Sequence, residues 1–265
     1  MTSLIDTHCH LDRDPLHASV DEVLARARAA GVVRCITIGT SVASSTASVA
    51  LAARYPDVYA AVGIHPHDAE TVTDESLAAI EALAQAPKVV AIGEVGLDHY
   101  RNHASPAAQA RAFRAFIAIA QRRHLPLLIH CRDAYDELLA MLRELSRAPV
   151  RGAIHCASGP AAFIRGALEL GLHISFSGIV TFPNARAVQA LVPLVPEHRL
   201  LIETDAPWLA PQPVRGQTNE PAYVAHTAAC VAQLRGISID ALGALTSRNA
   251  CQLLHLPQPD GATWN

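Results

Sequence analysis

The feature that most constrains the fold is a regular alternation of short, β-branched apolar runs with segments whose apolar residues recur at helical spacing. Strands that alternate with helices form parallel sheets, because each return to the same edge of the sheet needs a right-handed crossover helix. Eight runs have the character of strands: residues 4–8, 33–39, 58–63, 89–94, 125–130, 152–155, 173–177 and 200–204. Eight such units favour an α/β fold, a closed (β/α)8 TIM barrel.

The length of the chain agrees with this expectation, since 265 residues is close to the roughly 250 of a typical barrel. Residues 220–234 are expected to form the last barrel helix, and residues 239–254 an appended C-terminal helical segment. The 17 prolines are scattered rather than gathered into a linker, so we expect a single domain over residues 1–265. A doubly wound open sheet is the alternative, but no Gly-x-Gly-x-x-Gly motif follows a predicted strand.

The composition limits the cellular setting. Although 51% of the residues are hydrophobic, no stretch approaches the roughly 18 consecutive apolar residues of a membrane span. The first residues lead directly into a histidine-rich motif rather than into a signal-peptide pattern. We therefore expect a cytoplasmic protein with no membrane segment and no obligatory protein partner.

The six cysteines form no Cys-x-x-Cys pair and are expected to be reduced thiols. Cys9, Cys131 and Cys156 each directly adjoin a histidine that is singled out below. Because successive side chains on a strand point to opposite faces, these three thiols should point away from the histidines and into the packing.

The formal net charge of −3 argues against a broad basic surface that would hold duplex nucleic acid through its phosphates. An anionic substrate would have to be held locally, and bound metal ions can supply that positive charge inside a site.

Histidines and carboxylates fall at the carboxyl ends of the predicted strands, where barrel enzymes build their active sites. These residues are His8, His10, Glu94, His130, His155 and Asp205. The chain contains 14 histidines, so any one of them taken alone would be regarded as structural. Their common position at one barrel face favours a metal site instead.

Two histidines at positions i and i+2 of a strand point to the same side, so His8 and His10 can bind one ion together. Asp205 adds an oxygen ligand to this pair, and Glu94 is placed to bridge to a second ion. Zn, Mn, Co and Mg all remain open. Two such cations activate water at neutral pH, so we expect a hydrolase in which Asp205 is the general base.

Five segments carry a family resemblance. They are Asp-Thr-His-Cys-His-Leu-Asp at 6–12, Gly-Ile-His-Pro-His at 63–67, Ala-Ile-Gly-Glu-Val-Gly-Leu-Asp at 91–98, Ile-His-Cys-Arg-Asp-Ala at 129–134 and Glu-Thr-Asp-Ala-Pro-Trp at 203–208. The chain resembles the TatD family of metal-dependent deoxyribonucleases over essentially its whole length. The His-x-His element alone is shared with the wider amidohydrolase group.

The resemblance implies an amidohydrolase-like barrel that binds two divalent ions. The first ion would be held by His8, His10 and Asp205, and the second by His130 and His155, with Glu94 between them as a catalytic ligand. It further implies exonuclease activity on DNA, with single-stranded nucleic-acid ends, including RNA, as the expected substrate. The candidate substrate contacts are His65, Arg132 and Arg215.

Some positions admit two interpretations. His67 either shapes the loop around Pro66 or belongs to the site. The segment 219–221, Asn-Glu-Pro, either serves the site or simply begins a helix. Gln217 and Thr218 stand where family members often carry basic residues, which removes positive charge from the expected nucleic-acid path.

Three aromatic residues on strand-end loops, Tyr100, Phe182 and Trp208, would either stack on terminal bases or cap the barrel mouth.

Two other functional classes remain. A small-molecule amidohydrolase would use the same ions to polarise a carbonyl, although Lys88 lies at the wrong end of its strand to supply that group's carboxylated-lysine bridge. A non-catalytic binding or scaffold protein would keep the site without turnover.

Overall fold

The computed structural model describes residues 3–101, 103–145 and 150–257. The strands are β1 (Leu4–Cys9), β2 (Val32–Ile38), β3 (Val58–Val62), β4 (Val89–Asp98), β5 (Leu127–Arg132), β6 (Gly152–Ile154), β7 (His173–Phe176) and β8 (Leu200–Ile202). The α-helices are α1 (Val20–Ala29), α2 (Val42–Arg54), α3 (Asp74–Leu83), α4 (Pro106–Arg123), α5 (Tyr135–Leu145), α6 (Ala161–Glu169), α7 (Arg186–Gln189), α8 (Val224–Arg235) and α9 (Ile239–Leu254).

Short 3-10 helices occupy several of the connections. They are η1 (His17–Ser19), η2 (Pro66–Thr71), η3 (Gly178–Thr181), η4 (Val192–Leu194), η5 (Glu197–Arg199), η6 (Gln212–Val214) and η7 (Pro221–Tyr223). The expected last barrel helix is therefore two pieces, η7 followed by α8, while α9 has the predicted bounds.

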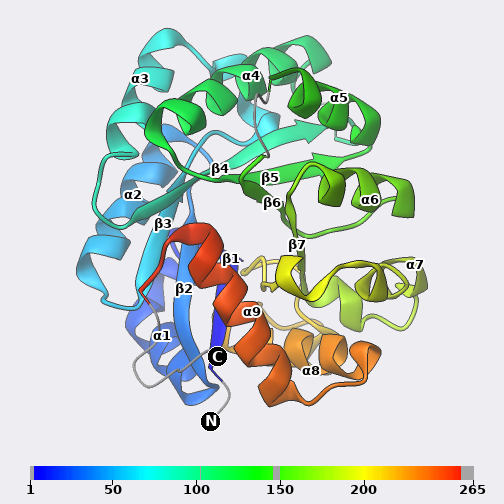
Figure 1. Ribbon diagram of the computed structural model, residues 1–265. Helices are drawn as coiled ribbons and strands as arrows, with labels where there is room; N and C mark the ends of the chain where they lie inside the picture. Colours follow the sequence, from blue (N-terminus) through cyan, green and yellow to red (C-terminus); the bar gives the residue numbers. More distant parts are fainter. Residues whose placement is uncertain (1–2, 102, 146–149, 258–265) are drawn as a thin grey trace.

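The eight strands form one parallel sheet in the order β1 to β8, with every neighbouring pair joined in sequence order. A parallel bridge between Cys9 and Ala206 brings the β8 side of the sheet back to β1. The helices lie outside this nearly closed barrel (Figure 1). The predicted (β/α)8 barrel is confirmed.

β4 is longer than predicted, since it continues beyond Glu94 to Asp98 and pairs with β5 as far as Arg132. Gly96 makes this extension possible. Its φ is +144°, and a Cβ at this position would lie 1.9 Å from the carbonyl oxygen of His130. A residue with a side chain could not pass so close to β5, so Gly96 lets the strand continue beyond residue 94, where the predicted strand ends.

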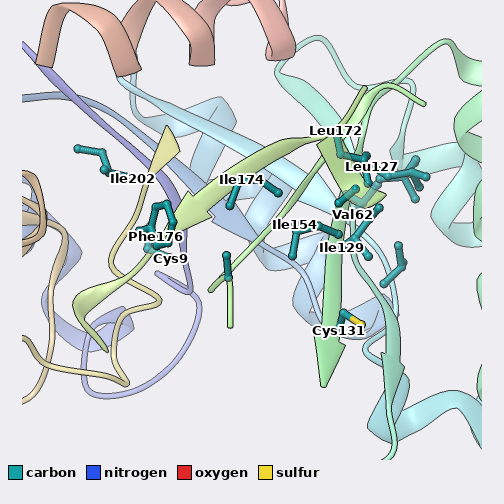
Figure 2. Packing of buried hydrophobic residues seen from close by; sticks show 14 of the residues in the cluster. Cys9, Val62, Leu127, Ile129, Cys131, Ile154, Leu172, Ile174, Phe176 and Ile202 are labelled. Carbon is teal, nitrogen blue, oxygen red and sulfur yellow. The ribbon is translucent and has the colours of Figure 1, made fainter. Parts of the chain in front are cut away.

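The buried hydrophobic residues form two clusters. One cluster fills the space between strands and helices, and Figure 2 shows part of it, including Ile129 and Cys131 of β5. Cys9 belongs to the same cluster, so it points away from the histidines on either side, as does Cys131. Cys156 lies beyond β6 and contacts the Ser177 hydroxyl at 3.2 Å instead. Burial raises the pKa of the Cys156 thiol to about 12, which keeps it protonated and unreactive.

A second cluster lies inside the barrel and joins apolar residues of the strands, such as Ile5 and Leu128, to Leu253 and Leu254 of α9. In Figure 1 this helix, coloured orange to red, crosses the end of the barrel. Because Ile5 and Leu128 lie near the starts of their strands, α9 covers the amino end, and the carboxyl end stays available for a site.

Within the described residues no single helix has the length and composition of a membrane span, and Pro221–Arg235 with α9 meets that test only as a pair bent by 107°.

Candidate metal centre

The structure brings the six predicted ligands together at the carboxyl end of the barrel. His8 lies on β1 and His10 directly after it; Glu94 and His130 lie on β4 and β5, and His155 and Asp205 follow β6 and β8. All are buried except His130 and Asp205, which are partly buried.

The Glu94 carboxylate is at the centre of the group. Its Oε1 lies 2.8 Å from His155 Nε2, 3.0 Å from His130 Nδ1 and 3.4 Å from His65 Nε2. Its Oε2 lies 3.5 Å from His8 Nε2 and 3.7 Å from His10 Nε2. One carboxylate therefore faces five imidazoles, an arrangement suited to a ligand shared between two cations.

Asp205 completes the side of the site next to β1, with its Oδ1 3.8 Å from His8 Nε2 and 3.5 Å from His10 Nε2. Three sets of ligand atoms lie within 4.8 Å of one another: His8 with His155 and Asp205, His8 with His10 and Glu94, and His65 with Glu94 and His130. His65, expected to contact substrate, is thus placed among the potential ligands. His130 Nδ1 and His155 Nε2, expected to share the second ion, are 3.2 Å apart.

The protonation of two histidines fits a metal ion. His10 Nδ1 lies 3.0 Å from the carbonyl oxygen of Ile38, which can only accept a hydrogen bond. A proton is therefore on Nδ1, and Nε2 points toward Glu94 and Asp205, where a cation would take the place of a second proton. In His8 both ring nitrogens are buried without a hydrogen-bond partner among the described residues. A buried polar atom without a partner is costly, and a cation at Nε2 would remove that cost.

The ionisation states of the two carboxylates and of His8 are also compatible with bound cations. Burial would raise the pKa of Glu94, but the neighbouring His155 and His65 outweigh it and hold that pKa well below its usual value. Burial would also raise the pKa of Asp205, but the hydrogen bond to His10 and the nearby His155 and His8 together lower it below its usual value. Burial, reinforced by His155, lowers the pKa of His8 and leaves its imidazole neutral with a free lone pair. Two carboxylates and several imidazoles form a donor set that divalent Zn, Mn or Co binds well.

Asp205 reaches the site from beyond the end of β8, which stops at Ile202 rather than at the predicted residue 204. The Asp205 N–H donates to the carbonyl of His8 at 2.9 Å, and the His10 N–H donates to the carbonyl of Ala206 at 2.7 Å. The segment after β8 therefore runs along β1 and places Asp205 beside the two β1 histidines. Its φ of 59° is left-handed, a conformation that aspartate adopts more readily than most residues.

Asn219 fixes the loop that carries Asp205. Its side chain is fully buried, and the Nδ2 amide donates to the carbonyls of Thr204 at 2.9 Å and Trp208 at 2.5 Å. The structure therefore corrects the helix-start interpretation of Asn219, because Glu220 is the residue before η7 and its side chain makes no cap hydrogen bond. Pro221 does lie in the first turn, as expected.

Two carboxylates that the sequence analysis missed lie behind the histidines. Asp98 Oδ2 is 3.0 Å from His130 Nε2, and Glu203 Oε1 is 3.4 Å from His155 Nδ1. Glu203 also accepts a hydrogen bond from the backbone N–H of Cys156 at 2.6 Å. A signal was present, because Asp98 follows Glu94 by four residues and Glu203 precedes Asp205 by two, spacings that keep side chains on one face of an extended chain.

The two arginines predicted to contact substrate both stack on aromatic rings. The Arg132 guanidinium lies 3.8 Å from the ring centroid of Tyr100, and that of Arg215 lies 4.1 Å from Phe182. Their role in substrate binding stays a prediction. Arg13 was not predicted. It follows β1 at this end of the barrel, is exposed, and donates to the Thr40 hydroxyl at 2.5 Å.

The aromatic residues at the mouth differ in exposure. Tyr100 is 53% exposed and Trp208 is 49% exposed, so these two rings do not close the barrel mouth as buried caps would. The Trp208 ring lies edge-on to His10 with the centroids 4.9 Å apart. An aromatic face is thus available to solvent directly beside the candidate metal centre.

Comparison with known proteins agrees with this geometry. A family model described as TatD related DNase matches residues 5–255. The chain is 38% identical over 253 residues to the uncharacterized metal-dependent hydrolase YabD of Bacillus subtilis, covering 96% of this chain and 99% of that protein. It is 39% identical over 261 residues to the 3′-5′ ssDNA/RNA exonuclease TatD of Edwardsiella piscicida, covering 96% and 100%.

Solved structures show the same relationship. The crystal structure of YJJV, a TatD homolog from Escherichia coli K12, superposes with a TM-score of 0.91 at 31% identity and covers 96% of this chain and 98% of that one. A phosphotriesterase homology protein from Escherichia coli, at 17% identity and a TM-score of 0.70, covers 95% and 98% and shares the fold. The resemblance found in the sequence is confirmed, and the chain belongs to the TatD family of metal-dependent hydrolases.

Proposed function

We propose that this protein is a two-metal phosphodiesterase that removes nucleotides from the ends of single-stranded DNA or RNA. The observation that carries the proposal is the position of Glu94, whose two oxygens face different histidines. Oε1 faces His130 and His155, whereas Oε2 faces His8 and His10. The Edwardsiella relative is a 3′-5′ ssDNA/RNA exonuclease, which supports the choice of substrate.

His8, His10 and Asp205 would hold one cation, and His130 and His155 the other, with Glu94 shared between them. His65, which also faces Glu94, is a further candidate ligand on the second side. Divalent cations bound here would supply Lewis acidity, neutralising charge on the phosphodiester and making water a better nucleophile near neutral pH.

Residues of the chain supply the general base and the contacts to phosphate. Asp205, whose carboxylate stays ionised, accepts the proton of the attacking water at its side-chain oxygen. The stacked guanidiniums of Arg132 and Arg215 and the exposed Arg13 hold phosphates of the substrate. Because the net charge is −3, these local cations rather than a basic surface must bind the polynucleotide. That restriction favours short single-stranded ends over duplex.

The test is digestion of end-labelled single-stranded DNA, single-stranded RNA and duplex DNA with Mg, Mn or Zn. Release of mononucleotides from linear single strands, with circular single-stranded DNA left intact, is the expected result. Asp205→Asn should lower the rate by about 100- to 10,000-fold, and Glu94→Gln should lower it severely. Asp133→Asn is the matched control, since Asp133 is exposed at the same end of the barrel and loses the same charge.

Three outcomes would overturn the proposal. Mononucleotide release that persists in EDTA would exclude a metal-dependent reaction. Hydrolysis of lactones, amides or dipeptides without action on oligonucleotides would identify a small-molecule amidohydrolase. A protein that binds its full complement of metal but turns over none of these substrates would be a binding protein.

A further inference from the structure

Asp98, the last residue of β4, is a buried carboxylate with four close polar partners. Its Oδ1 accepts hydrogen bonds from the backbone N–H groups of Tyr100 and Arg101, both at 2.9 Å. Its Oδ2 lies 3.0 Å from His130 Nε2 and 2.9 Å from His67 Nε2. One side chain thus joins the turn after β4 to two histidines of the site.

The backbone of Asp98 is held as firmly as its side chain. Gln109 of α4 is buried, and its side-chain carbonyl accepts from the Asp98 N–H at 2.7 Å. The Gln109 amide group donates to the carbonyls of Asp98 and Ala104, both at 2.9 Å. The carboxylate is therefore fixed on both sides, as a residue must be if it is to orient another.

The geometry points to Asp98 as a positioning residue that sets the tautomer of His130, so that the proton is on Nε2 and the Nδ1 lone pair faces Glu94. This inference rests on the proposed metal centre. An ionised carboxylate can only accept hydrogen bonds, so the nitrogen that faces Asp98 must carry a proton. The other nitrogen, Nδ1, is 3.0 Å from Glu94 Oε1, and a cation held by Glu94 would take the place of any proton on Nδ1 while Asp98 keeps the proton on Nε2.

Asp98 also links the metal centre to the mouth of the barrel. The Tyr100 N–H that it holds belongs to the residue whose ring supports the Arg132 guanidinium at 3.8 Å. The same carboxylate thus orients His130, a candidate metal ligand, and holds the residue whose ring supports Arg132. His67, which the sequence left between a loop-shaping role and a site role, is the second imidazole on Oδ2.

Asp98→Asn tests the tautomer of His130, because an asparagine side chain has almost the same shape as an aspartate side chain. The asparagine carbonyl can replace Oδ1 and keep both backbone hydrogen bonds of the turn. Its amide nitrogen then takes the place of Oδ2 and donates, so His130 Nε2 must accept and the ring proton moves to Nδ1. The variant should fold like the unmodified protein while presenting a protonated nitrogen to the metal.

Two measurements decide the question, and neither needs a substrate. Zn²⁺ titration by calorimetry should show about 10- to 100-fold weaker binding at one site of Asp98→Asn. Asp133→Asn should bind Zn²⁺ with the affinity of the unmodified protein. The Zn²⁺ affinity of His67→Ala should be close to that value, because the Asp98 carboxylate still faces His130 in this variant. Nitrogen-15 NMR of the Zn²⁺-loaded unmodified protein should show the His130 proton on Nε2, assigned by its loss in His130→Gln.

The proposal is overturned by a His130 proton on Nδ1 in the Zn²⁺-loaded protein, or by unchanged Zn²⁺ affinity in a folded Asp98→Asn. If that variant fails to fold, the NMR measurement on the unmodified protein still decides. A protein with this tautomer and this Zn²⁺ dependence but without nuclease activity would refute the proposed function and leave the role of Asp98 standing.

Discussion

The imidazole rings of His8 and His155 lie face to face, with centroids 4.0 Å apart and ring planes 10° from parallel. One residue belongs to β1 and the other follows β6, so the stack joins opposite parts of the barrel through its interior. Both rings also contact Glu94, at 3.5 Å and 2.8 Å. The candidate ligands therefore form one connected cluster rather than two separate sites.

Because the ligands come from five parts of the barrel, bound cations should stabilise the fold. A ligand at 100 times its Kd that binds only the folded state adds about 2.7 kcal/mol, or about 5 to 10 °C in Tm. Thermal unfolding of EDTA-treated protein, with and without added Zn²⁺, measures this shift. Asp205→Asn should show a clearly smaller shift, and equal shifts in both proteins would contradict the assignment of Asp205 as a ligand.

Asn219→Ala should destabilise the protein and also slow catalysis. The substitution leaves the carbonyls of Thr204 and Trp208 without their donor, and we expect a loss of about 2 to 3 kcal/mol in the free energy of unfolding. Urea denaturation measures that loss. Activity should fall further than the loss of folded protein explains, because the Asp205 loop is no longer held. A stable variant with full activity would show that Asn219 does not fix the loop.

Trp208→Ala should weaken the binding of oligonucleotides through loss of base stacking. The ring is 49% exposed and lies beside His10. Stacking of a base on an aromatic ring contributes about 1 to 3 kcal/mol, so KM should rise about 5- to 150-fold while kcat changes little. Trp208→Phe should retain most of the affinity. An oligonucleotide with an abasic terminal nucleotide should be insensitive to the substitution, and an equal effect on both substrates would exclude stacking.

The stability of the protein should fall on acidification through His173, which lies at the start of β7, away from the metal centre. Burial, with a contribution from Arg199, lowers the pKa of His173 to about 4. The unfolded chain binds a proton near pH 6.5 and the folded protein only near pH 4, so this stability is fully present above pH 6.5 and is lost as the pH falls to about 4. The difference amounts to about 3 kcal/mol.

Urea denaturation at several pH values would measure this effect by comparing the unmodified protein with His173→Gln. The variant should lose less stability between pH 7 and pH 4 than the unmodified protein does. His17→Gln, the same change at an exposed histidine, is the matched control. Parallel curves for the unmodified protein and His173→Gln would refute the role of His173.

The alternation of strands and helices and the place of each candidate ligand along the chain are properties of local sequence, so the barrel and the set of six candidate ligands could be predicted without coordinates. Residues at strand ends meet in any barrel with this strand order. The extension of β4 was missed because the need for Gly96 arises only from its contact with the His130 carbonyl on the neighbouring strand.

Hydrophobic period and strand order are properties of the sequence, and they are enough to predict the barrel and the meeting of six side chains at its carboxyl end. These side chains are His8, His10, Glu94, His130, His155 and Asp205. Three features emerge only in the folded chain: Asp98 faces His130, Asn219 holds the Asp205 loop, and Trp208 is half exposed. These contacts join residues far apart in the chain through loop paths and side-chain directions, which depend on packing and hydrogen bonds across the whole barrel rather than on any local pattern.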